Sequence, residues 1–425
     1  MNTSTLLKSG GEKGDVVLES IREQRDIRVY DSYDVIIIGG GVAGMSAALA
    51  ARRNGMRTLL VEKAAFMGGL ATLGHVCLYL PLCDGNGRKV IGGISEELLH
   101  LSIQYGYNDL PEGWTRGILH HPDPKGRYKT WFNIPAFVLA ADELMENEGV
   151  DILYDTVFCE PVMDGKTVTG VIVENKSGRC AYKAKMVVDA SGDADVLYRA
   201  GAACFDRPTI LSYWCYETDF KHMRKALESG NIRDAVVVPM MGLLPKIEPE
   251  DMTGERADKP GERGQMREYY GTDGKEVSQY LQVSRKFALE RLKERMGPEY
   301  TQLSVAGMGA FRTTRRITGC YELHPEDMNK HFDDSIGCTG DWRKAGPVYE
   351  IPYRCLIDPE VQNVFAAGRI IASADDAWEV TTAAMTGEAA GTAAALAVRS
   401  GCTSGEVNVA ELQKILANNG VILHI

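Results

Sequence analysis

The chain has 425 residues, which is enough for two or three domain-sized cores. Its composition, 44% hydrophobic and 25% charged, is that of a globular protein, and a net charge of −11 without a block of Lys or Arg argues against nucleic-acid binding. The N-terminal residues lack the apolar core of a signal peptide, and glycines interrupt the long uncharged run at 35–51, so we expect neither secretion nor a membrane span. Ten cysteines without a CxxC pair favour reduced thiols in a cytoplasm over a zinc ribbon or an iron–sulfur cluster.

The first predicted elements follow a polar lead-in of residues 1–32. Residues 35–38, VIII, form the continuous β-branched run of a buried parallel strand. An Ala-rich helix over 45–53 follows and ends near Asn54, and residues 58–63 form the next strand. Strand, glycine turn, helix and strand thus come in the order of a βαβ unit.

Two later regions resemble this pattern in composition. A helix over 141–149 leads into a β-meander over 150–193, which turns at DGK and KSG and returns to the main sheet at MVVDASGD. Towards the end of the chain, residues 361–370 indicate a strand that ends in a Gly-Arg turn, and 378–401 indicate a long helix capped by Gly401. We expect these regions to complete the first domain.

The middle of the chain differs. Residues 246–275 are polar and rich in Gly and Pro, which predicts a surface excursion or a lid. Residues 276–296 then place their apolar side chains on one face of an amphipathic helix. We therefore expect a second, substrate-side domain made of residues 100–140 and 211–344.

The glycine turn has the spacing of a dinucleotide-binding site. Gly39 makes the tight turn, Gly41 lets the backbone approach a pyrophosphate, and Gly44 allows close packing of helix on strand. The helix start at Val42 and Ala43 offers N–H groups to the phosphates.

Glu62 lies about 20 residues past the second glycine of this turn, where an acid binds a ribose 2′-hydroxyl and disfavours NADP. The alternative is a glycine-rich turn that only packs against its helix. A second strand–GxGxxG–helix unit is missing from the sequence, because Gly307-Met308-Gly309 lacks the third glycine, so a separate NAD(P)H domain is not expected.

Several motifs carry a family resemblance. The Gly68-Gly69 pair, the meander that closes on VVDASGDAD, and NVFAAGR with its Ala/Gly-rich helix resemble the FAD-dependent oxidoreductases of the glutathione-reductase superfamily. GGLATLG, RRITG, YEIPYR and AGRIIAS…WEVT…GEAAG are most similar to the bacterial FAD-dependent oxidoreductase family, which is distantly similar to fumarate reductase flavoproteins. One departure is WEVTTAAM, where the family's closing helix often carries an Arg.

The resemblance implies an α/β fold: a glutathione-reductase-type, FAD-binding Rossmann-like domain with an inserted α+β substrate domain. The FAD-binding domain would comprise residues 33–99, 141–210 and 345–425. The closing helix would direct its N-terminus at the flavin, with Asp376 and Glu379 at the spacing of a capping box. The residues implied in FAD binding, beyond the glycine turn, are Glu62, Lys63, Gly69, Leu70, Ala71, Thr72, Val157, Ala190, Ser191, Gly192, Asp195, Gly368, Arg369, Glu379 and Val380.

The segment after the Gly-Gly pair contains two cysteines and a histidine. Cys77 and Cys83 lie later than the redox pair of disulfide reductases, in the apolar run CLYLPLC, so we interpret them as packing residues, with a redox pair as the alternative. His75 comes three residues after Thr72. It is either a hydrogen-bonded, partly buried histidine or a residue that transfers a proton or orients the substrate.

Further candidates for substrate chemistry come from two motifs. In FRTTRRITG, Arg312 and Arg315 could clamp a carboxylate or donate a proton, or could belong to a salt-bridge cluster. In YEIPYR, Tyr353 and Arg354 are either site residues or packing residues. His120-His121 lacks further ligands at a suitable spacing, so we expect no metal site.

Together these features predict a cytoplasmic FAD-dependent oxidoreductase that transfers a hydride between flavin N5 and a small organic substrate, by dehydrogenation or double-bond reduction. A flavin-dependent hydroxylase is one alternative, and a flavin-bearing electron-transfer subunit of a larger complex is another. The electron donor or acceptor and a homo-oligomeric state stay open.

Overall fold

The computed structural model describes residues 21, 23–107, 110, 129–242, 268–341, 345–374 and 379–425. Of the expected lid over 246–275, residues 246–267 therefore lie outside the described residues. The same holds for His120-His121 and for Asp376.

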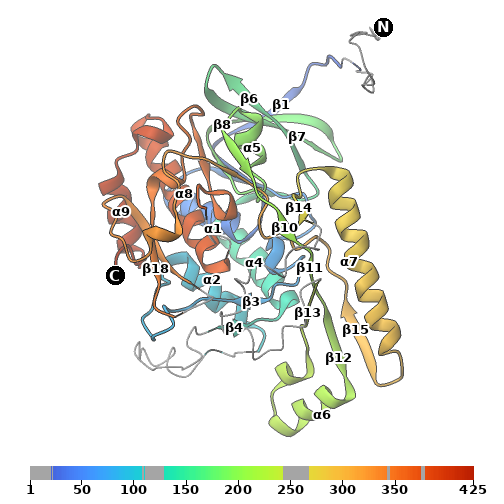
Figure 1. Cartoon of the computed structure of the whole chain (residues 1–425). Coiled ribbons are helices and arrows are strands. Elements are labelled where there is room, and N and C mark those ends of the chain that lie inside the picture. Colours follow the sequence, from blue (N-terminus) through green and yellow to red (C-terminus); the bar gives the residue numbers. More distant parts are fainter. Residues whose placement is uncertain are drawn as a thin grey trace, which may run out of the picture.

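A seven-stranded sheet forms the centre of the molecule (Figure 1). Its parallel strands run in the order β5-β2-β1-β8, and β19 is parallel to the end of β8. The run Val35–Ile38 is buried, because helices cover this part of the sheet, and the predicted buried strand is confirmed. The bounds are β1 (Arg28–Ile38), β2 (Thr58–Val61), β5 (Asp151–Leu153), β8 (Gly178–Asp189) and β19 (Val364–Ala366).

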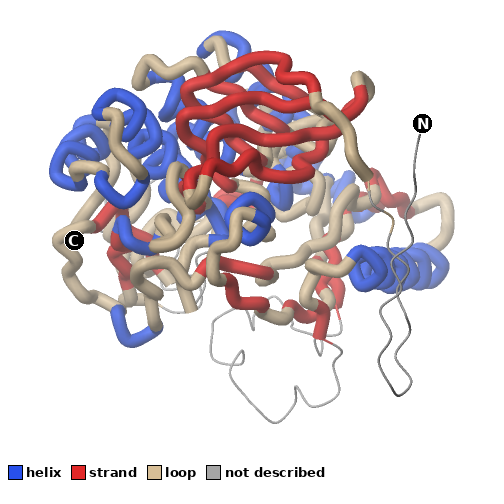
Figure 2. The backbone as a smooth tube through the Cα atoms, turned by 90° about the horizontal axis from the view of Figure 1, so that it is seen from above, coloured by secondary structure: helices blue, strands red, loops and turns tan. Residues whose placement is uncertain are grey.

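The β-meander is also present. β6 (Val157–Asp164) and β7 (Thr167–Asn175) pair antiparallel with each other, and β7 pairs antiparallel with β8. β8 therefore belongs to both parts of the sheet: it pairs with β7 over its first half and with β19 at its end. Seen from above, these strands lie side by side with helices beside them (Figure 2).

The closest helix contact joins α1 (Val42–Arg53) and α8 (Val380–Ser400). At Gly387 and Gly391 of α8, a Cβ atom would clash with carbonyl oxygens of α1, so only glycine permits this approach. The other main helices of this domain are α2 (Gly93–Gln104), α4 (Ile134–Glu148), the short α5 (Asp195–Arg199) and α9 (Val409–Asn418). Among the described residues, none of the helices is both long enough and apolar enough for a membrane span.

The expected division into domains stays a prediction, and the boundaries expected at residues 100 and 141 fall inside the continuous helices α2 and α4. The capping box is wrong for Glu379: its backbone is extended, with φ −64° and ψ 153°, so it is the N-cap of α8 and not a residue of the first turn. Gly401 caps the other end of α8 in the left-handed conformation, as predicted.

The second unit consists of two-stranded ladders and two helices on one side of the main domain (Figure 1). It has a small core of its own around Tyr280, with Leu211, Tyr269 and Phe311. The predicted amphipathic helix is α7, and it buries Tyr280 and Ala288. The elements are β10 (Thr209–Ile210) with β14 (Glu268–Tyr269), β11 (Ser212–Trp214) with β13 (Met240–Gly242), β12 (Tyr216–Asp219) with β15 (Tyr300–Ser304), α6 (Phe220–Ser229) and α7 (Gly274–Glu294).

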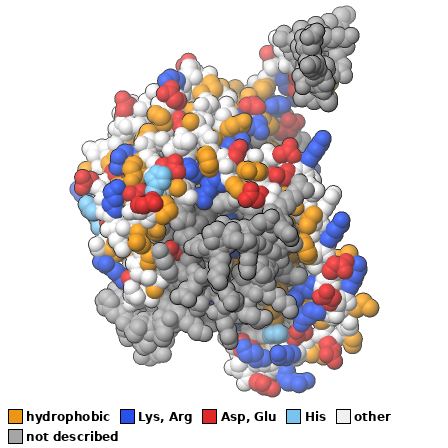
Figure 3. Space-filling view, in the orientation of Figure 1, with side chains coloured by type: hydrophobic (Ala, Val, Ile, Leu, Met, Phe, Trp, Pro, Cys, Tyr) orange, Lys and Arg blue, Asp and Glu red, His pale blue; other side chains and the backbone are white. Residues whose placement is uncertain are grey.

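Three further ladders connect the two units or border the main domain. They are β3 (Leu78–Tyr79) with β4 (Thr130–Trp131), β9 (Cys204–Asp206) with β16 (Arg315–Ile317), and β17 (Ser335–Gly340) with β18 (Val348–Pro352). On the face shown in Figure 3, acidic and basic side chains are interspersed over the described surface.

Candidate functional site

The turn between β1 and α1 has the features that the glycine spacing predicts. Gly39 has φ +101°, and a Cβ atom there would clash with the backbone of Ala190. A Cβ atom on Gly44 would clash with the carbonyl of Gly39, so the helix packs directly on the turn. At Gly41, by contrast, no described atom lies within 4 Å of a Cβ position, and no side chain of the described residues caps the helix start. The N–H groups there are therefore available to an anion.

Glu62, directly after β2, is buried and stabilises this turn by hydrogen bonds. Its Oε2 accepts the N–H of Gly40 at 2.6 Å, and its Oε1 accepts the N–H of Ala64 at 2.7 Å. The backbone carbonyl of Glu62 accepts the N–H of Thr156 at 3.1 Å, which places Val157 beside it. Since a carboxylate oxygen has more than one lone pair, Glu62 can also accept a hydroxyl of a bound ribose.

The Gly-Gly segment lies next to the glycine turn. Gly68 forms an isolated parallel bridge with Gly41, and its N–H donates to the carbonyl of Gly40 at 2.8 Å. The next residues, Gly69–Ala71, form a 3-10 turn that ends at the buried Thr72. Two segments that the sequence places apart thus line one cradle, as the resemblance implies.

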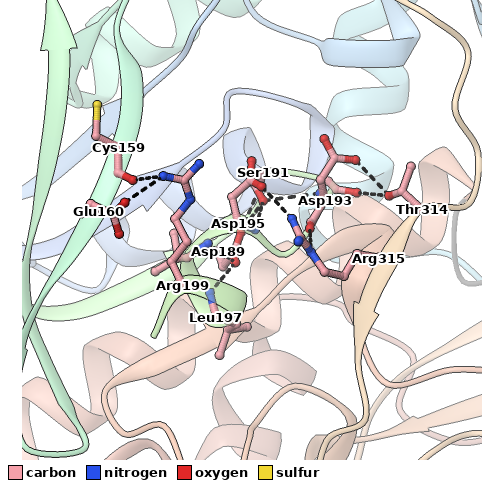
Figure 4. A network of polar contacts seen from close by, with 12 residues as sticks. Cys159, Glu160, Asp189, Ser191, Asp193, Asp195, Leu197, Arg199, Thr314 and Arg315 are labelled. Atoms are coloured by element: carbon pink, nitrogen blue, oxygen red, sulfur yellow. Dashed lines mark hydrogen bonds and ion pairs between the residues drawn. The ribbon is translucent and has the colours of Figure 1, made fainter. Parts of the chain in front are cut away.

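Asp189, at the end of β8, organises the loop over 190–195 (Figure 4). Its Oδ1 accepts the N–H and the hydroxyl of Ser191, at 3.1 and 2.6 Å. Its Oδ2 accepts the N–H groups of Val196 and Leu197, at 2.9 and 3.0 Å. Burial raises the pKa of this carboxyl to about 6. Sequence reasoning missed Asp189, although an acid at the end of a buried strand was a signal for it.

Two arginines from the C-terminal part of the chain contact the same loop. Arg315 donates to the carbonyl of Asp193 at 2.9 Å and to Asp195 Oδ1 at 3.0 Å (Figure 4). Arg369 donates to the carbonyl of Gly192 at 2.6 Å and to Asp193 Oδ1 at 2.9 Å. The structure therefore brings the predicted residues Gly192, Asp195, Arg315 and Arg369 together.

The two loop carboxyls have different electrostatic environments. Burial acts to raise the pKa of Asp193, but the positive charges of Arg369 and Lys63 hold it below its ordinary value. Burial and the neighbouring Asp193 raise the pKa of Asp195, against the charges of Arg315 and Lys63. The loop thus holds two carboxyls close to three cations, Arg315, Arg369 and Lys63.

Gly368 lies between the first turn of α1 and the second turn of α8. The N–H of Gly368 donates to the hydroxyl of Thr386 in α8 at 3.0 Å, and a Cβ atom on Gly368 would lie 3.0 Å from Cβ of Ala43 in α1. Gly387 and Gly391 of α8 lie against Ala43 and Ala47 of α1, so the two helices run in the same direction and their positive dipole ends lie on the same side of the domain.

His75 is the candidate catalytic residue whose surroundings are most distinct. It is buried, with φ +59°, and its ring lies between two strands of the second unit. Its Nδ1 is 3.3 Å from the carbonyl of Trp214, and its Nε2 is 2.9 Å from Oγ of Ser304. Because a carbonyl only accepts, Nδ1 carries the hydrogen, and Nε2 of the neutral ring accepts from Ser304. Burial lowers the pKa of His75, which favours this neutral form.

A series of aromatic side chains and one arginine extends from this position. The ring of Tyr216 lies 5.9 Å from that of His75, and its hydroxyl is 3.2 Å from the hydroxyl of Tyr107. The guanidinium of Arg233 lies over the ring of Trp131, at 4.9 Å from its centroid. Sequence reasoning missed these residues, because they come from separate segments that share no motif.

The two cysteines of this segment are free and buried. Burial raises the pKa of Cys77 to about 12, so its thiol is protonated at neutral pH and is a poor nucleophile. These surroundings favour the interpretation of Cys77 and Cys83 as packing residues over that of a redox pair.

The other arginine candidates are dispersed. Arg312 lies near the sulfur of Met240, at 3.6 Å, in the second unit. Arg354 pairs with Asp334 at 2.9 Å, and Tyr353 is buried with its hydroxyl donating to the carbonyl of Ser404. These contacts favour packing roles for Tyr353 and Arg354. They favour a structural role for Arg315 also, because both of its polar contacts are in the loop over 190–195.

Comparison with protein families matches residues 34–205 and 247–416 to the family described as FAD dependent oxidoreductase. Because the match covers most of the chain, this protein belongs to that family. FAD is its cofactor, and it is an FAD-dependent oxidoreductase with the α/β, Rossmann-like fold that the sequence predicted.

Curated relatives match over shorter stretches. The chain is 28% identical over 168 residues to a digeranylgeranylglycerophospholipid reductase of Picrophilus torridus, which is 38% of this chain and 39% of that one. It is 54% identical over 74 residues to a 3-oxosteroid 1-dehydrogenase of Mycolicibacterium smegmatis, or 17% and 13% of the two chains. The matches thus span less than half the length of these relatives.

Among solved structures, a geranylgeranyl bacteriochlorophyll reductase-like protein of Thermoplasma acidophilum matches at a TM-score of 0.45, with 12% identity, over 91% of this chain and 84% of that one. A p-nitrophenol 4-monooxygenase of Pseudomonas putida matches at a TM-score of 0.46, also with 12% identity, over 92% and 86%.

The residues of the cradle fit FAD. The open space at Gly41 and the uncapped start of α1 suit the pyrophosphate, and Glu62 suits the adenosine ribose. The start of α8 suits the flavin end, where a helix N-terminus favours an anionic reduced ring.

Proposed function

We propose that this protein transfers a hydride between bound FAD and a small organic substrate, in a dehydrogenation or a double-bond reduction. The observation that carries the proposal is the place of His75. It follows Thr72 of the cradle by three positions, and its ring contacts Trp214 and Ser304 of the second unit. A group that can take up or release a proton therefore lies where the cofactor segment meets the second unit.

His75 has the properties of a general acid–base. FAD, when bound, supplies the hydride exchange, and the matching proton must move to or from the substrate. The neutral ring of His75 can accept that proton at Nε2 through the Ser304 hydroxyl that donates to this nitrogen, and in a reduction the protonated ring can return it by the same hydroxyl. Ser304 contacts Nε2 and is itself exposed, so its hydroxyl can carry the proton between His75 and solvent.

The surroundings of His75 suit an organic substrate with an apolar part and a polar group. Tyr107, Tyr216 and Trp131 offer aromatic surface, and Arg233 offers a positive charge. The names of the two curated relatives, a reductase and a dehydrogenase, support this reaction type. An electron donor or acceptor would complete the cycle.

Anaerobic titration tests the proposal. The purified enzyme, in its oxidised and its reduced form, is mixed with a panel of carboxylic acids, alcohols and enoates, and the visible spectrum of the bound flavin is followed. We expect one class to reduce or reoxidise the flavin, and His75→Ala to slow this step while the flavin stays bound. The matched variant His100→Ala, on the exposed face of α2, should behave as the parent.

Two outcomes would replace the proposal. If NAD(P)H reduces the flavin and the panel compound is hydroxylated in the presence of oxygen, the protein is a hydroxylase. If only a partner protein exchanges electrons with the flavin, it is an electron-transfer subunit.

A further inference from the structure

Three side chains with metal-binding atoms lie together away from the cofactor cradle. His331 precedes β17, Glu350 lies on β18, and His424 follows α9 near the end of the chain. Their ligand atoms all lie within 4.8 Å of one another. We infer that these residues bind a divalent transition-metal ion of the Zn²⁺ type.

The carboxylate of Glu350 is preorganised for this role. It is buried, and its Oε2 accepts the N–H of Phe332 at 2.8 Å. The same oxygen faces Nδ1 of His424 at 2.9 Å and Nδ1 of His331 at 3.4 Å. A fixed carboxylate thus lies beneath two imidazoles, while both histidines are exposed and leave the site open to ions from solvent.

The second nitrogen of His331 has a partner that suits a metal ligand. Its Nε2 lies 3.4 Å from Oδ1 of Asp333. With Nδ1 facing the site, Nε2–H can donate to this carboxylate, which is the arrangement that orients a metal-bound histidine and increases its basicity.

The donor set selects the class of metal. Two imidazole nitrogens and one carboxylate oxygen suit Zn²⁺ and related ions, whereas Ca²⁺ and Mg²⁺ prefer oxygen ligands. Zn²⁺ bonds of about 2.1 Å place tetrahedral ligand atoms roughly 3.4 Å apart. The Glu350 oxygen is already near this spacing from both nitrogens, at 2.9 and 3.4 Å, so rotations of the exposed histidine side chains can complete it, and water can take the fourth position.

The site joins segments that are remote in sequence. Near it, the hydroxyl of Ser335 in β17 already donates to the carbonyl of Leu423 at 2.6 Å. A metal ion on His331, Glu350 and His424 would add a second link between the β17–β18 hairpin and the segment after α9. Because the ion binds the folded chain only, it would raise the unfolding temperature.

Isothermal titration of the EDTA-treated, FAD-loaded enzyme with Zn²⁺ tests the inference. We expect one ion bound per chain at this site and a higher unfolding temperature with Zn²⁺. Each of His331→Ala, His424→Ala and Glu350→Gln should weaken the affinity at least about tenfold. His100→Ala, another exposed histidine, is the matched control and should keep the parent affinity.

Flavin content and the unfolding temperature in EDTA show whether each variant folds. Both histidines are exposed, so their variants remain informative even if Glu350→Gln disturbs the contact with Phe332. The inference is overturned if the parent binds no Zn²⁺, or if the His331→Ala/His424→Ala double variant binds it as tightly as the parent. It is equally overturned if a His120→Ala/His121→Ala variant, and not the site variants, loses Zn²⁺ binding.

Discussion

Ser304 Oγ lies 2.9 Å from Nε2 of His75, although 229 positions separate the two residues in the chain. A second contact accompanies it: the N–H of Gly307 donates to the carbonyl of Leu73 at 2.8 Å. The second unit therefore holds the segment that continues from the cofactor cradle. The orientation of His75 depends on the packing of the two units and not on its own segment alone.

Removing the hydroxyl should slow proton transfer without releasing the cofactor. In Ser304→Ala, Nε2 of His75 loses its donor and its link to solvent, and we expect flavin reduction by substrate to slow about tenfold. His75→Ala removes the acid–base group itself and should cost about 100-fold or more. Anaerobic stopped-flow spectroscopy measures both rates. Ser278→Ala, at an exposed position of α7, is the control. Unchanged rates in both site variants would exclude this role.

The pH profile of the rate of flavin reduction should reflect the lowered pKa of His75 on its acid side. Burial disfavours the imidazolium, so the pKa lies below the ordinary 6.5 and the neutral ring persists as the pH falls through that value. For substrate dehydrogenation, we expect the rate of flavin reduction to fall only below pH 6.5. The pH profile of the parent and of His75→Gln measures this, and an acid limb at or above 6.5 in the parent would contradict it.

Asp189 should be essential for the loop that follows β8. Asn in its place keeps one oxygen and presents an NH₂ group at the other position, so either the N–H groups of Val196 and Leu197 or the N–H of Ser191 lose their acceptor. We expect Asp189→Asn to lower the free energy of unfolding by about 2 kcal/mol and to weaken FAD binding about tenfold. Flavin titration of the apoprotein measures the affinity. The exposed Asp164→Asn should leave it unchanged, and a parent-like Asp189→Asn would refute this role.

Glu388 should make stability depend on pH. Its Oε2 accepts the N–H of Ile94 at the start of α2, and burial raises its pKa from 4.5 to about 7. The folded chain therefore keeps a proton that the unfolded chain releases, so the contribution of Glu388 is full below pH 4.5 and is lost as the pH rises through about 7.

Glu388→Gln mimics the neutral form of the side chain, so the variant should not lose stability as the pH rises through about 7. We compare the free energy of unfolding of the variant with that of the parent at each pH. We expect this difference to shift in favour of the variant between pH 5 and pH 8, by on the order of 3 kcal/mol. Chemical unfolding at both pH values, at a fixed FAD concentration, measures the difference. A difference between the two proteins that is the same at pH 5 and pH 8 would show that Glu388 does not titrate in this range.

The cysteines should be dispensable for turnover. Cys77 and Cys83 are buried, and the thiolate of Cys77 is disfavoured. The Cys77→Ser/Cys83→Ser double variant should retain bound flavin and its rates of reduction and reoxidation, with some loss of stability because a hydroxyl enters an apolar core. Loss of reoxidation with bound flavin would instead identify a redox pair.

Much of the fold could be predicted because it rests on short-range patterns. The β-branched run of β1, the glycine turn, the Ala-rich α1 and the Gly401 cap of α8 each occupy one segment, and local sterics specify them. The domain boundaries could not be predicted as well. α2 and α4 run through them because both helices pack in the main domain, and that packing is a long-range property.

By itself, the sequence determined the dinucleotide turn: Gly39, Gly41, Gly44 and Glu62 stand close in the chain at the required spacing, and the family resemblance of further short motifs implied that the dinucleotide is FAD. Only the tertiary structure decided what surrounds it. It paired Arg315 with the loop over 190–195, and it set His75 against Ser304. The same is true of His331, Glu350 and His424, which form a cluster only after β18 and the C-terminal segment pack. Such contacts join segments tens to hundreds of residues apart, so packing of the whole chain, and no local pattern, brings them together.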